Sequence, residues 1–359
     1  MKTFEEIFTD KTKYGVKVQT SEYGKRGKYI IIDQGQSQIA GYTDREEGVF
    51  EELPVIVFGD HTRTIKYVDK PFFLGADGVK VLRSKDSNAN YKYLYYALKS
   101  AKIPDTGYNR HFKWLKKIQI NYPDNNRQEE IVQILDKVSD IIKNRESELS
   151  ALDELIKARF VEMFGDPVAN PKGLIKKTLP ELGEFGRGVS KHRPRNDEAL
   201  LGGPYPLIQT GDVANSGLYI TDYHSTYSEL GLQQSKMWDE GTLCITIAAN
   251  IAKTAILGFD ACFPDSIVGF IANEDTNNVF VHYWFSFFQE ILESQAPESA
   301  QKNINLKILS ELKVIVPNIQ EQNEFADFVV QVEKTKDTIQ KSLDETQILF
   351  DSFMQKYLG

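Results

Sequence analysis

Two distant parts of this chain share one pattern. Residues 107–165 align without a gap on residues 301–359, because the offset is 194 at both ends (301 − 107 and 359 − 165). Few residues are identical, and they include Lys113 and Lys307, Pro123 and Pro317, Gln128 and Gln322, Val138 and Val332, Leu155 and Leu349, and Gly165 and Gly359. A tandem repeat of this kind restricts the chain to two units of similar architecture.

Each copy contains the same succession of elements. A short alternating strand, "KIQINYP" or "LKVIVP", runs into a proline, and after a polar turn a Gln-x-Glu triplet begins a helix. Apolar residues then recur at heptad spacing, as Ile131, Leu135, Val138, Ile142, Leu149, Leu152, Ile156 and Met163 in the first copy and Phe325, Val329, Val332, Ile339, Leu343, Phe350 and Phe353 in the second. We predict that the two helices, each about 55 Å long, pack on each other as an antiparallel coiled-coil pair.

The two copies also correspond upstream of these helices. The strand pattern "YIIIDQGQ" (29–36) matches "YPLIQTGDV" (205–213), and the aromatic helix "YKYLYYALKS" (91–100) matches "VHYWFSFFQE" (281–290). Because their aromatic residues recur at helical spacing, we assign Tyr93, Tyr96, Trp284 and Phe288 to the core. The predicted organisation is a tandem of globular domains over 1–123 and 166–317, with long helices over 124–165 and 318–359.

The formal net charge of −8 argues against a nucleic-acid partner only if it is spread over the whole chain. Residues 124–165 carry ten acidic and six basic side chains, and residues 318–359 carry eight and four, so each helical region contributes −4. Together they account for the whole excess of −8. The two globular domains are therefore near neutral. A basic cluster on them is either a solvated face, which is the commoner case, or a surface that binds phosphates.

Several classes of protein are disfavoured by what the sequence lacks. The N-terminal stretch has no apolar core of an export signal, and the longest apolar run (242–259) is interrupted by Asn250 and Lys253. The two cysteines, Cys244 and Cys262, are too few for a disulfide framework and have no metal-ligand spacing. We expect a cytoplasmic protein without a membrane span, a cofactor or a metal.

No catalytic signature is found along the chain, neither a phosphate-binding glycine loop nor a dinucleotide fingerprint nor a zinc-protease motif. The segment "FGDHTR" (58–63) places Asp60, His61 and Arg63 close together. An acid–base cluster is one interpretation, and a turn that touches a ligand or bonds its own loop is the other, which we favour. The absence of a catalytic set fits a protein that holds or reads another molecule.

With these features, the chain resembles the specificity subunit of a type I restriction-modification system. The resemblance is carried by "LPVIVFGDHTRTIKYVDKPFFLGADGVKVL" (53–82) and "TGYNRHFKWLKKI" (106–118) in the first unit. In the second unit it is carried by "YPLIQTGDV", "GTLCITIAANIAKTAILGFDACFPDSIVGFI" (241–271) and "NINLKILSELKVIVPNIQEQ" (303–322). The central "ARFVEMFGDPVANPKG" is similar to the junction between the first helix and the second recognition domain in this family.

The resemblance implies a fold and a function. Each globular domain would be a target recognition domain, with an α+β fold and a curved, mostly antiparallel sheet. Each would read one half of a split, asymmetric site in double-stranded DNA. The helices would set the spacing and dock two methyltransferase (modification) subunits, and restriction/translocase subunits would join the complex. The subunit itself would not be an enzyme.

DNA recognition requires arginine, lysine, asparagine or glutamine side chains on loops and strand ends. In the first unit the candidates are His61, Arg63, Lys66, Tyr108, Asn109, Arg110 and His111. In the second unit they are Lys191, Arg193, Arg195, Gln209, Thr210, Asn250, Lys253, Gln301, Lys302 and Asn303. Asn109 and Asn303 precede a strand at matched positions, where an asparagine can instead cap a turn.

Two other functions stay open at this point. A non-enzymatic scaffold could carry two ligand-binding domains on a helical stalk, although the order of the motifs and the missing export signal disfavour it. A DNA-modifying enzyme would need a cofactor pocket for which we find no motif.

Overall fold

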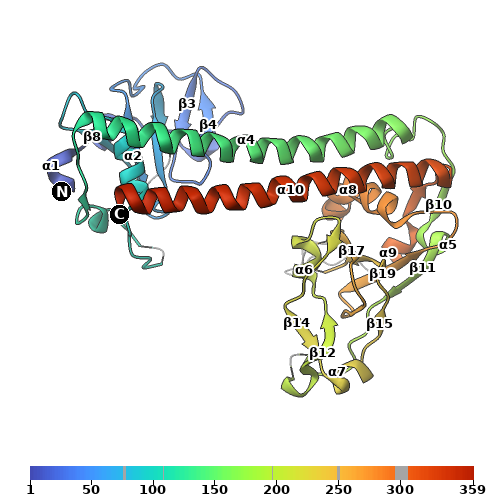
Figure 1. Cartoon of the computed structure of the whole chain (residues 1–359). Helices are drawn as coiled ribbons and strands as arrows, with labels where there is room; N and C mark the ends of the chain where they lie inside the picture. The colour runs from blue at the N-terminus through green and yellow to red at the C-terminus, as the bar shows by residue number, and fades with distance from the viewer. Residues whose placement is uncertain (76–77, 108, 196, 249–250, 296–305) are drawn as a thin grey trace. The chain divides into compact units, whose positions relative to one another are not determined.

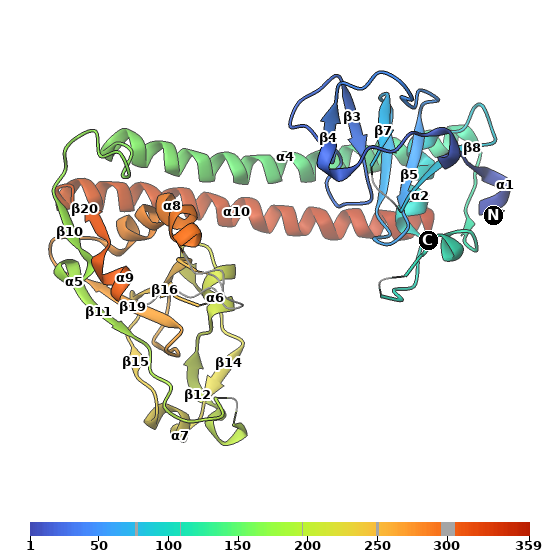
Figure 2. The ribbon, with the colours of Figure 1, turned by 180° about the vertical axis from the view of Figure 1, so that it is seen from behind.

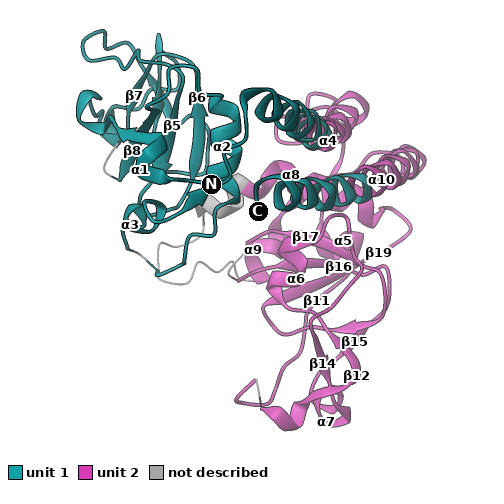
Figure 3. Ribbon diagram, turned by 60° about the vertical axis from the view of Figure 1, so that its left-hand side comes forward, with its two compact units in different colours: residues 1–146, 341–359 teal, residues 147–340 magenta. Residues whose placement is uncertain are grey.

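The computed structural model describes residues 1–75, 78–107, 109–195, 197–248, 251–295 and 306–359. The chain forms two compact units (Figure 3). Unit 1 comprises residues 1–146 and 341–359, and unit 2 comprises residues 147–340. Each unit therefore contains one globular domain together with part of each of the two long helices.

The long helices are α4 (Asn125–Phe164) and α10 (Ile319–Leu358), each of 40 residues (Figure 1). Their bounds agree with the prediction to within one residue at each end. Asp124 Oδ1 accepts the Arg127 N–H (2.9 Å) and Asn318 Oδ1 accepts the Gln320 N–H (2.9 Å), so both helices begin with a side-chain cap at repeat-equivalent positions. Gly165, with φ of 79°, ends α4 in the left-handed conformation that glycine adopts readily.

Opposite halves of the two helices pack together in each unit. In unit 1 the first half of α4 supplies Ile131 and Leu135 to a cluster with Phe350 and Met354 of α10. In unit 2 the second half of α4 supplies Ile156 and Phe160 to a cluster with Phe325 and Val329 from the first half of α10. This pairing confirms the predicted antiparallel arrangement.

The globular part of unit 1 contains two sheets (Figure 2). One is antiparallel in the order β2-β8-β5-β6 and the other has the order β4-β3-β7, with β3 parallel to β7. A short pair, β1-β9, lies outside them. The elements are β1 (Lys2–Thr3), α1 (Phe4–Ile7), β2 (Phe8–Asp10), η1 (Thr12–Tyr14), η2 (Thr20–Glu22), β3 (Tyr29–Ile32), β4 (Gly41–Thr43), β5 (Val55–Gly59), β6 (Ile65–Val68), β7 (Phe72–Leu74), β8 (Val79–Ser84), α2 (Tyr91–Ser100), α3 (Phe112–Leu115) and β9 (Gln119–Ile120).

Unit 2 repeats this plan with additions. Its sheets have the orders β11-β19-β16-β17-β13, β14-β12-β18-β15 and β10-β20. The elements are β10 (Lys176–Thr178), α5 (Leu179–Leu182), β11 (Gly183–Arg187), η3 (Glu198–Leu200), β12 (Leu201–Leu207), α6 (Thr210–Asn215), β13 (Tyr219–Ile220), β14 (Ser225–Tyr227), α7 (Glu229–Gln233), β15 (Met237–Trp238), β16 (Leu243–Thr246), β17 (Thr254–Leu257), β18 (Ala261–Cys262), β19 (Ile267–Ala272), α8 (Asn278–Gln295), α9 (Leu306–Glu311) and β20 (Lys313–Ile315).

The strand register shows that the two domains are structural repeats. In unit 1, Val57 of β5 pairs with Lys66 of β6 on one side and with Val81 of β8 on the other. In unit 2, Cys244 of β16 pairs in the same way with Ala255 of β17 and Gly269 of β19. Most strand pairs in both units are antiparallel, as predicted. Position 66 of unit 1 therefore corresponds to position 255 of unit 2.

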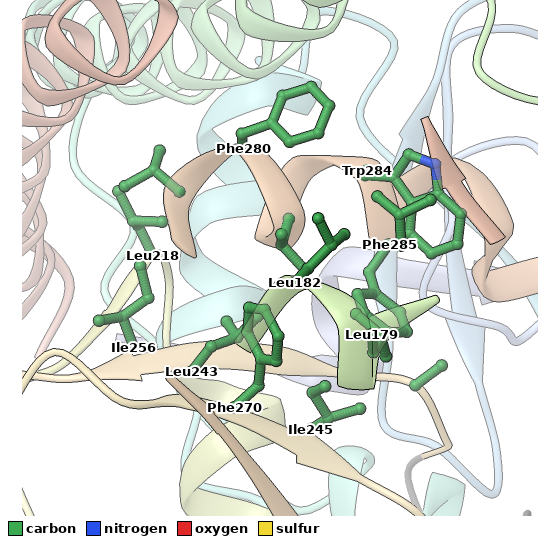
Figure 4. Packing of buried hydrophobic residues seen from close by; sticks show 14 of the residues in the cluster. Leu179, Leu182, Leu218, Leu243, Ile245, Ile256, Phe270, Phe280, Trp284 and Phe285 are labelled. Atoms are coloured by element: carbon green, nitrogen blue, oxygen red, sulfur yellow. The ribbon is translucent and has the colours of Figure 1, made fainter. Parts of the chain in front are cut away.

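The aromatic helix of each domain lies between its sheet and the long helices. In unit 2, Trp284 and Phe285 of α8 share a hydrophobic cluster with Leu243 and Phe270 of the sheet, whereas Phe280 points away from the sheet (Figure 4) and stacks on Phe160 of α4. In unit 1, residues of α2 occupy the corresponding cluster with Phe58 and Leu82. Tyr93, Tyr96 and Trp284 are buried and Phe288 is partly buried, which confirms their assignment to the core.

Three observations on the described part of the chain bear on function. None of its helices is both long and apolar enough to cross a membrane. Its His, Cys, Asp and Glu side chains form no group of three that could hold a metal ion. Cys244 and Cys262 are buried free thiols, and burial raises the pKa of both.

Candidate nucleic-acid interface

The turn between β5 and β6 recurs in unit 2 with the same backbone bonds. The Gly59 N–H donates to the Thr64 carbonyl and the Arg63 N–H to the Gly59 carbonyl, both at 2.8 Å. In unit 2 the Thr246 N–H donates to the Lys253 carbonyl and the Ala252 N–H to the Thr246 carbonyl, both at 2.9 Å. Arg63 and Ala252 have positive φ angles of 61° and 56°. Each turn thus contains one residue in the left-handed conformation. The turns differ in their side chains and in length, with four residues between Gly59 and Thr64 and six between Thr246 and Lys253.

The first unit brings its two candidate segments together at this turn. Arg63 Nη2 donates to Asp105 Oδ2 (2.7 Å), which links the turn to the segment that contains residues 106–111. The Asp60 carbonyl accepts the His111 N–H (2.7 Å), and the Asp60 carboxylate accepts the Phe112 N–H (2.7 Å). Asp60 is buried, and it bonds the segment at 111–112 rather than its own loop, which gives it a structural role.

The candidates of unit 1 differ in exposure. Asn109 and Arg110 are exposed and His61 is half-buried, while Tyr108 lies outside the described residues. Asn109 Nδ2 donates to the Thr106 carbonyl, so it closes a turn. Lys66 and His111 are buried, and we therefore leave both out of the set of side chains that could reach base edges. Sequence analysis counted them because side-chain type does not reveal which face of a strand or loop is covered.

A loop that the sequence analysis missed lies beside the same turn. Residues 33–38 follow β3 and contain three glutamines. Gln34 accepts the His61 N–H through Oε1 (3.2 Å) and the Thr62 hydroxyl through its carbonyl (2.6 Å), while Gln36 and Gln38 are exposed. The signal was present in the sequence, because "YIIIDQGQ" matches the segment in which Gln209 and Thr210 were selected.

The glutamine loop and the turn line a cavity of about 500 Å³. Its polar lining includes Gln36, Gln38, Thr62, Arg63, Lys66 and Lys99. Burial lowers the pKa of the Lys66 ammonium, and the nearby Asp33 carboxylate opposes that shift. Amide, hydroxyl and guanidinium groups of this kind can bond base edges or phosphates.

In unit 2 the candidates Arg195, Gln209 and Thr210 meet at a second cavity, of about 320 Å³. Arg195 bonds the Asp265 carboxylate, and Arg193 Nη2 lies 3.6 Å from the same group. Arg195, Gln209 and Thr210 line the cavity together with Ser190, Ser225 and Tyr227. The arrangement gathers guanidinium, amide and hydroxyl donors that were distant in the sequence.

The other candidates of unit 2 lie apart from this cavity. Lys191 is exposed, and Lys253, on the turn before β17, donates to Gln289 Oε1 of α8 (3.2 Å). Asn250, Gln301, Lys302 and Asn303 lie outside the described residues. The unit 2 segment that corresponds to residues 107–111, at 301–305, therefore lies outside the described residues.

Comparisons with known proteins agree on one family. The model of the type I restriction modification DNA specificity domain matches residues 2–151 and 171–347. The EcoR124I/EcoR124II type I restriction enzyme specificity subunit of Escherichia coli is 26% identical over 357 residues, covering 93% of this chain and 85% of that protein. The putative MjaX type I restriction enzyme specificity subunit of Methanocaldococcus jannaschii is 22% identical, covering 77% and 71%.

Solved structures show the same fold. The S subunit of a type I restriction-modification system from M. genitalium superimposes with a TM-score of 0.60 at 19% identity, covering 100% of this chain and 95% of that one. A chain from a structural study of complex assembly and conformational transition in the type I R-M system superimposes with a TM-score of 0.55 at 16% identity, covering 99% and 95%.

Proposed function

The chain belongs to the type I restriction-modification DNA specificity family, and from this premise we propose that its two domains read different halves of one bipartite DNA target. A specificity subunit is the non-catalytic component that recognises DNA in such a system. The observation that carries the bipartite target is the pair of matching turns. Both have the same backbone bonds, while one presents Arg63 and the other Ala252. One scaffold with two sets of side chains suits two unlike half-sites.

The proposed contacts in unit 1 are Arg63, Asn109 and Arg110, together with Gln36 and Gln38. In unit 2 they are Lys191, Arg193, Arg195, Gln209 and Thr210, with Lys253 at the second turn. His61, Tyr108, Asn250, Gln301, Lys302 and Asn303 stay in the proposal on sequence grounds. Arginine side chains commonly donate hydrogen bonds to guanine and to phosphate, and glutamine side chains form paired hydrogen bonds with adenine. A protein that acts on the host genome in this way would work in the cytoplasm.

We further propose that two methyltransferase subunits, and through them restriction/translocase subunits, dock on the long helices. Leu155 and Leu349 are identical residues at the repeat offset of 194, and their exposed fractions are 47% and 46%. Exposed leucines favour contact with an apolar partner surface. Two equivalent leucines in two equivalent helices suit two copies of the same partner.

Methylation mapping tests the proposal most directly. The chain would be expressed with its methyltransferase partner in a host without methylation of its own, and methylated positions would be read across the genome. We expect a motif with two unlike halves separated by a fixed number of unspecified bases. Arg63→Ala should relax only one half and Arg195→Ala only the other. A continuous motif, or one in which both substitutions relax the same half, would contradict two independent readers.

A further inference from the structure

Lys66 is a buried lysine in a place where the fold does not require one. Its side chain is 2% exposed and lies on β6, opposite Val57 of β5. The equivalent residue of unit 2 is Ala255, which is fully buried opposite Cys244. The same scaffold therefore folds with a methyl group at this position. A buried ammonium is costly, so its presence in unit 1 calls for a role other than packing.

The charge of Lys66 is only partly balanced within the described part of the protein. Its ammonium has three donors and no acceptor. Nζ donates to the Ser37 carbonyl at 2.6 Å, and Asp33 Oδ1 lies 3.5 Å away, at the limit of a hydrogen bond. The Asp33 side chain is itself 28% exposed, which weakens its attraction for the ammonium. An additional negative group would complete the coordination of Nζ.

The cavity beside Lys66 gathers cationic side chains, of which Arg63 is also paired with the Asp105 carboxylate (2.7 Å) and Lys66 with that of Asp33 (3.5 Å). Three cations, Arg63, Lys66 and Lys99, are among the described residues that line it, and no aspartate or glutamate is. Lys99 forms no ion pair with a described residue, and its ammonium lies 5.9 Å from the centre of the Tyr95 ring. Gln36 and Gln38 add neutral amide donors. In a chain of net charge −8, such a cavity is a local exception.

We propose that this cavity binds a phosphate group, which Lys66 contacts from the buried side while Arg63 and Lys99 contact it from the rim. A tetrahedral oxyanion offers several acceptors to donors that converge from different directions, and lysine commonly binds phosphate as a point charge. The volume of about 500 Å³ admits a phosphate with its attached sugar. The phosphate group belongs to the DNA backbone if the proposed function is correct, and this part of the inference rests on that function. A free phosphate ion is the other source of the same chemistry.

The test compares the full-length chain with Lys66→Ala, which copies the residue of unit 2, and with Lys66→Met, which keeps most of the volume. Lys137→Ala, on the exposed face of α4, removes an equal charge elsewhere and serves as the control. In the first arm, binding to a fixed DNA duplex is measured against salt concentration. Loss of one phosphate contact should reduce the slope of log K against log salt by about 0.9, with no such change in the control.

In the second arm, inorganic phosphate replaces chloride at constant ionic strength, without DNA. The midpoint of thermal unfolding should rise for the original chain and for Lys137→Ala, and should not move for either Lys66 variant. If both Lys66 variants misfold, Lys99→Ala on the rim of the cavity tests the same site.

The outcomes separate the proposal of a phosphate site from the proposed function in reading DNA. Equal responses of the original chain and the Lys66 variants in both arms would overturn the phosphate site. A phosphate response that depends on Lys66, with an unchanged salt slope, would uphold the site and assign it to a free ion. Failure of the original chain to bind DNA at all would instead count against the proposed function. The second arm would still test whether the cavity binds phosphate.

Discussion

At the scale of single residues, both copies of the repeat contain a proline followed five residues later by a glutamine, Gln128 or Gln322. The bonds of these glutamines explain the shared spacing. Both side chains are buried, and each folds back so that Nε2 donates to the carbonyl of the preceding proline, Pro123 (2.8 Å) or Pro317 (2.9 Å). The bond joins the end of the short strand to the first turn of the long helix. It therefore sets the direction in which the helix leaves its domain.

Gln322 also holds unit 2 together through three further bonds. Its Oε1 accepts the Thr276 hydroxyl (2.9 Å) and the Asn277 N–H (3.1 Å), and its Nε2 also donates to the Asp275 carbonyl (3.1 Å). We expect Gln322→Ala to lower the free energy of unfolding by about 3 kcal/mol, because several buried polar groups lose their partner. Gln128→Ala should cost about 1 kcal/mol. Urea denaturation measures both, with exposed Gln320→Ala as a control within about 0.5 kcal/mol of the original.

We expect His282 to make the stability of unit 2 depend on pH. Desolvation, aided by the nearby Lys336 charge, lowers the pKa of His282 to about 4, while its Nδ1 lies 2.9 Å from the Thr254 hydroxyl. An unfolded histidine titrates near pH 6.5, so between pH 6.5 and 4 the unfolded state gains a proton that the folded state does not.

The folded state should therefore lose stability as the pH falls through this window, by up to about 3 kcal/mol. Denaturation curves between pH 7 and 4 would measure the loss. In His282→Asn the histidine contribution should be absent and the curve flatter over that range. An identical pH profile for the two proteins would show that folding does not lower the pKa of His282.

At the scale of elements, the hairpins and the long helices differ in which of their features the two copies share. The β5–β6 and β16–β17 hairpins keep their register and vary the turn side chains, as suits domains that read different sequences. The long helices keep both their register and an exposed leucine, as suits surfaces that serve identical partners. The repeat is therefore retained most strongly in the helices.

The helix surfaces yield a prediction about partner number. Leu155→Glu and Leu349→Glu should each reduce the number of bound methyltransferase subunits from two to one, and the double variant should bind none, since a charge in an apolar contact is costly. Mass measurement of the purified complex gives the stoichiometry. Val168→Glu, an equally exposed residue in the loop after α4, is the matched control. Two bound subunits in both single variants would place the docking surface elsewhere.

At the scale of the whole molecule, the second copy can substitute for part of the first. Ile156, Phe160 and Phe164 of α4 stand 194 residues before Phe350, Met354 and Leu358 of α10. A fragment of residues 1–165 would lack α10 and expose Ile131 and Leu135. Because α4 carries the equivalent apolar residues in its second half, two fragments can rebuild the antiparallel pair.

We therefore expect the fragment 1–165 to form a dimer, which light scattering on a sizing column would detect as twice the chain mass. Leu135→Asp should abolish the dimer, because it places a charge in the contact between helices. A fragment that stays monomeric with its partner subunits present would contradict the paired-helix arrangement.

Much of the architecture was predictable from local patterns. The heptad stripes, the prolines and the capping residues indicated both long helices to within one residue, since each signal lies within a few positions of the element it limits. The aromatic core residues of α2 and α8 could also be predicted from the sequence, because helical spacing places those side chains on one face. Family membership then decided between the DNA reader and the ligand-binding scaffold that the sequence left open.

The candidate site was harder to predict. Arg63 was identified correctly as a turn residue, whereas Lys66, three positions later, proved to be buried, and the glutamine loop was missed. The repeat, the helices and their antiparallel pairing were determined by the sequence alone, because periodicity is a property of neighbouring residues. Which polar side chains reach a common cavity was decided only by tertiary structure. Residues 36, 63 and 99 come from different elements, and strand pairing and helix packing bring them together.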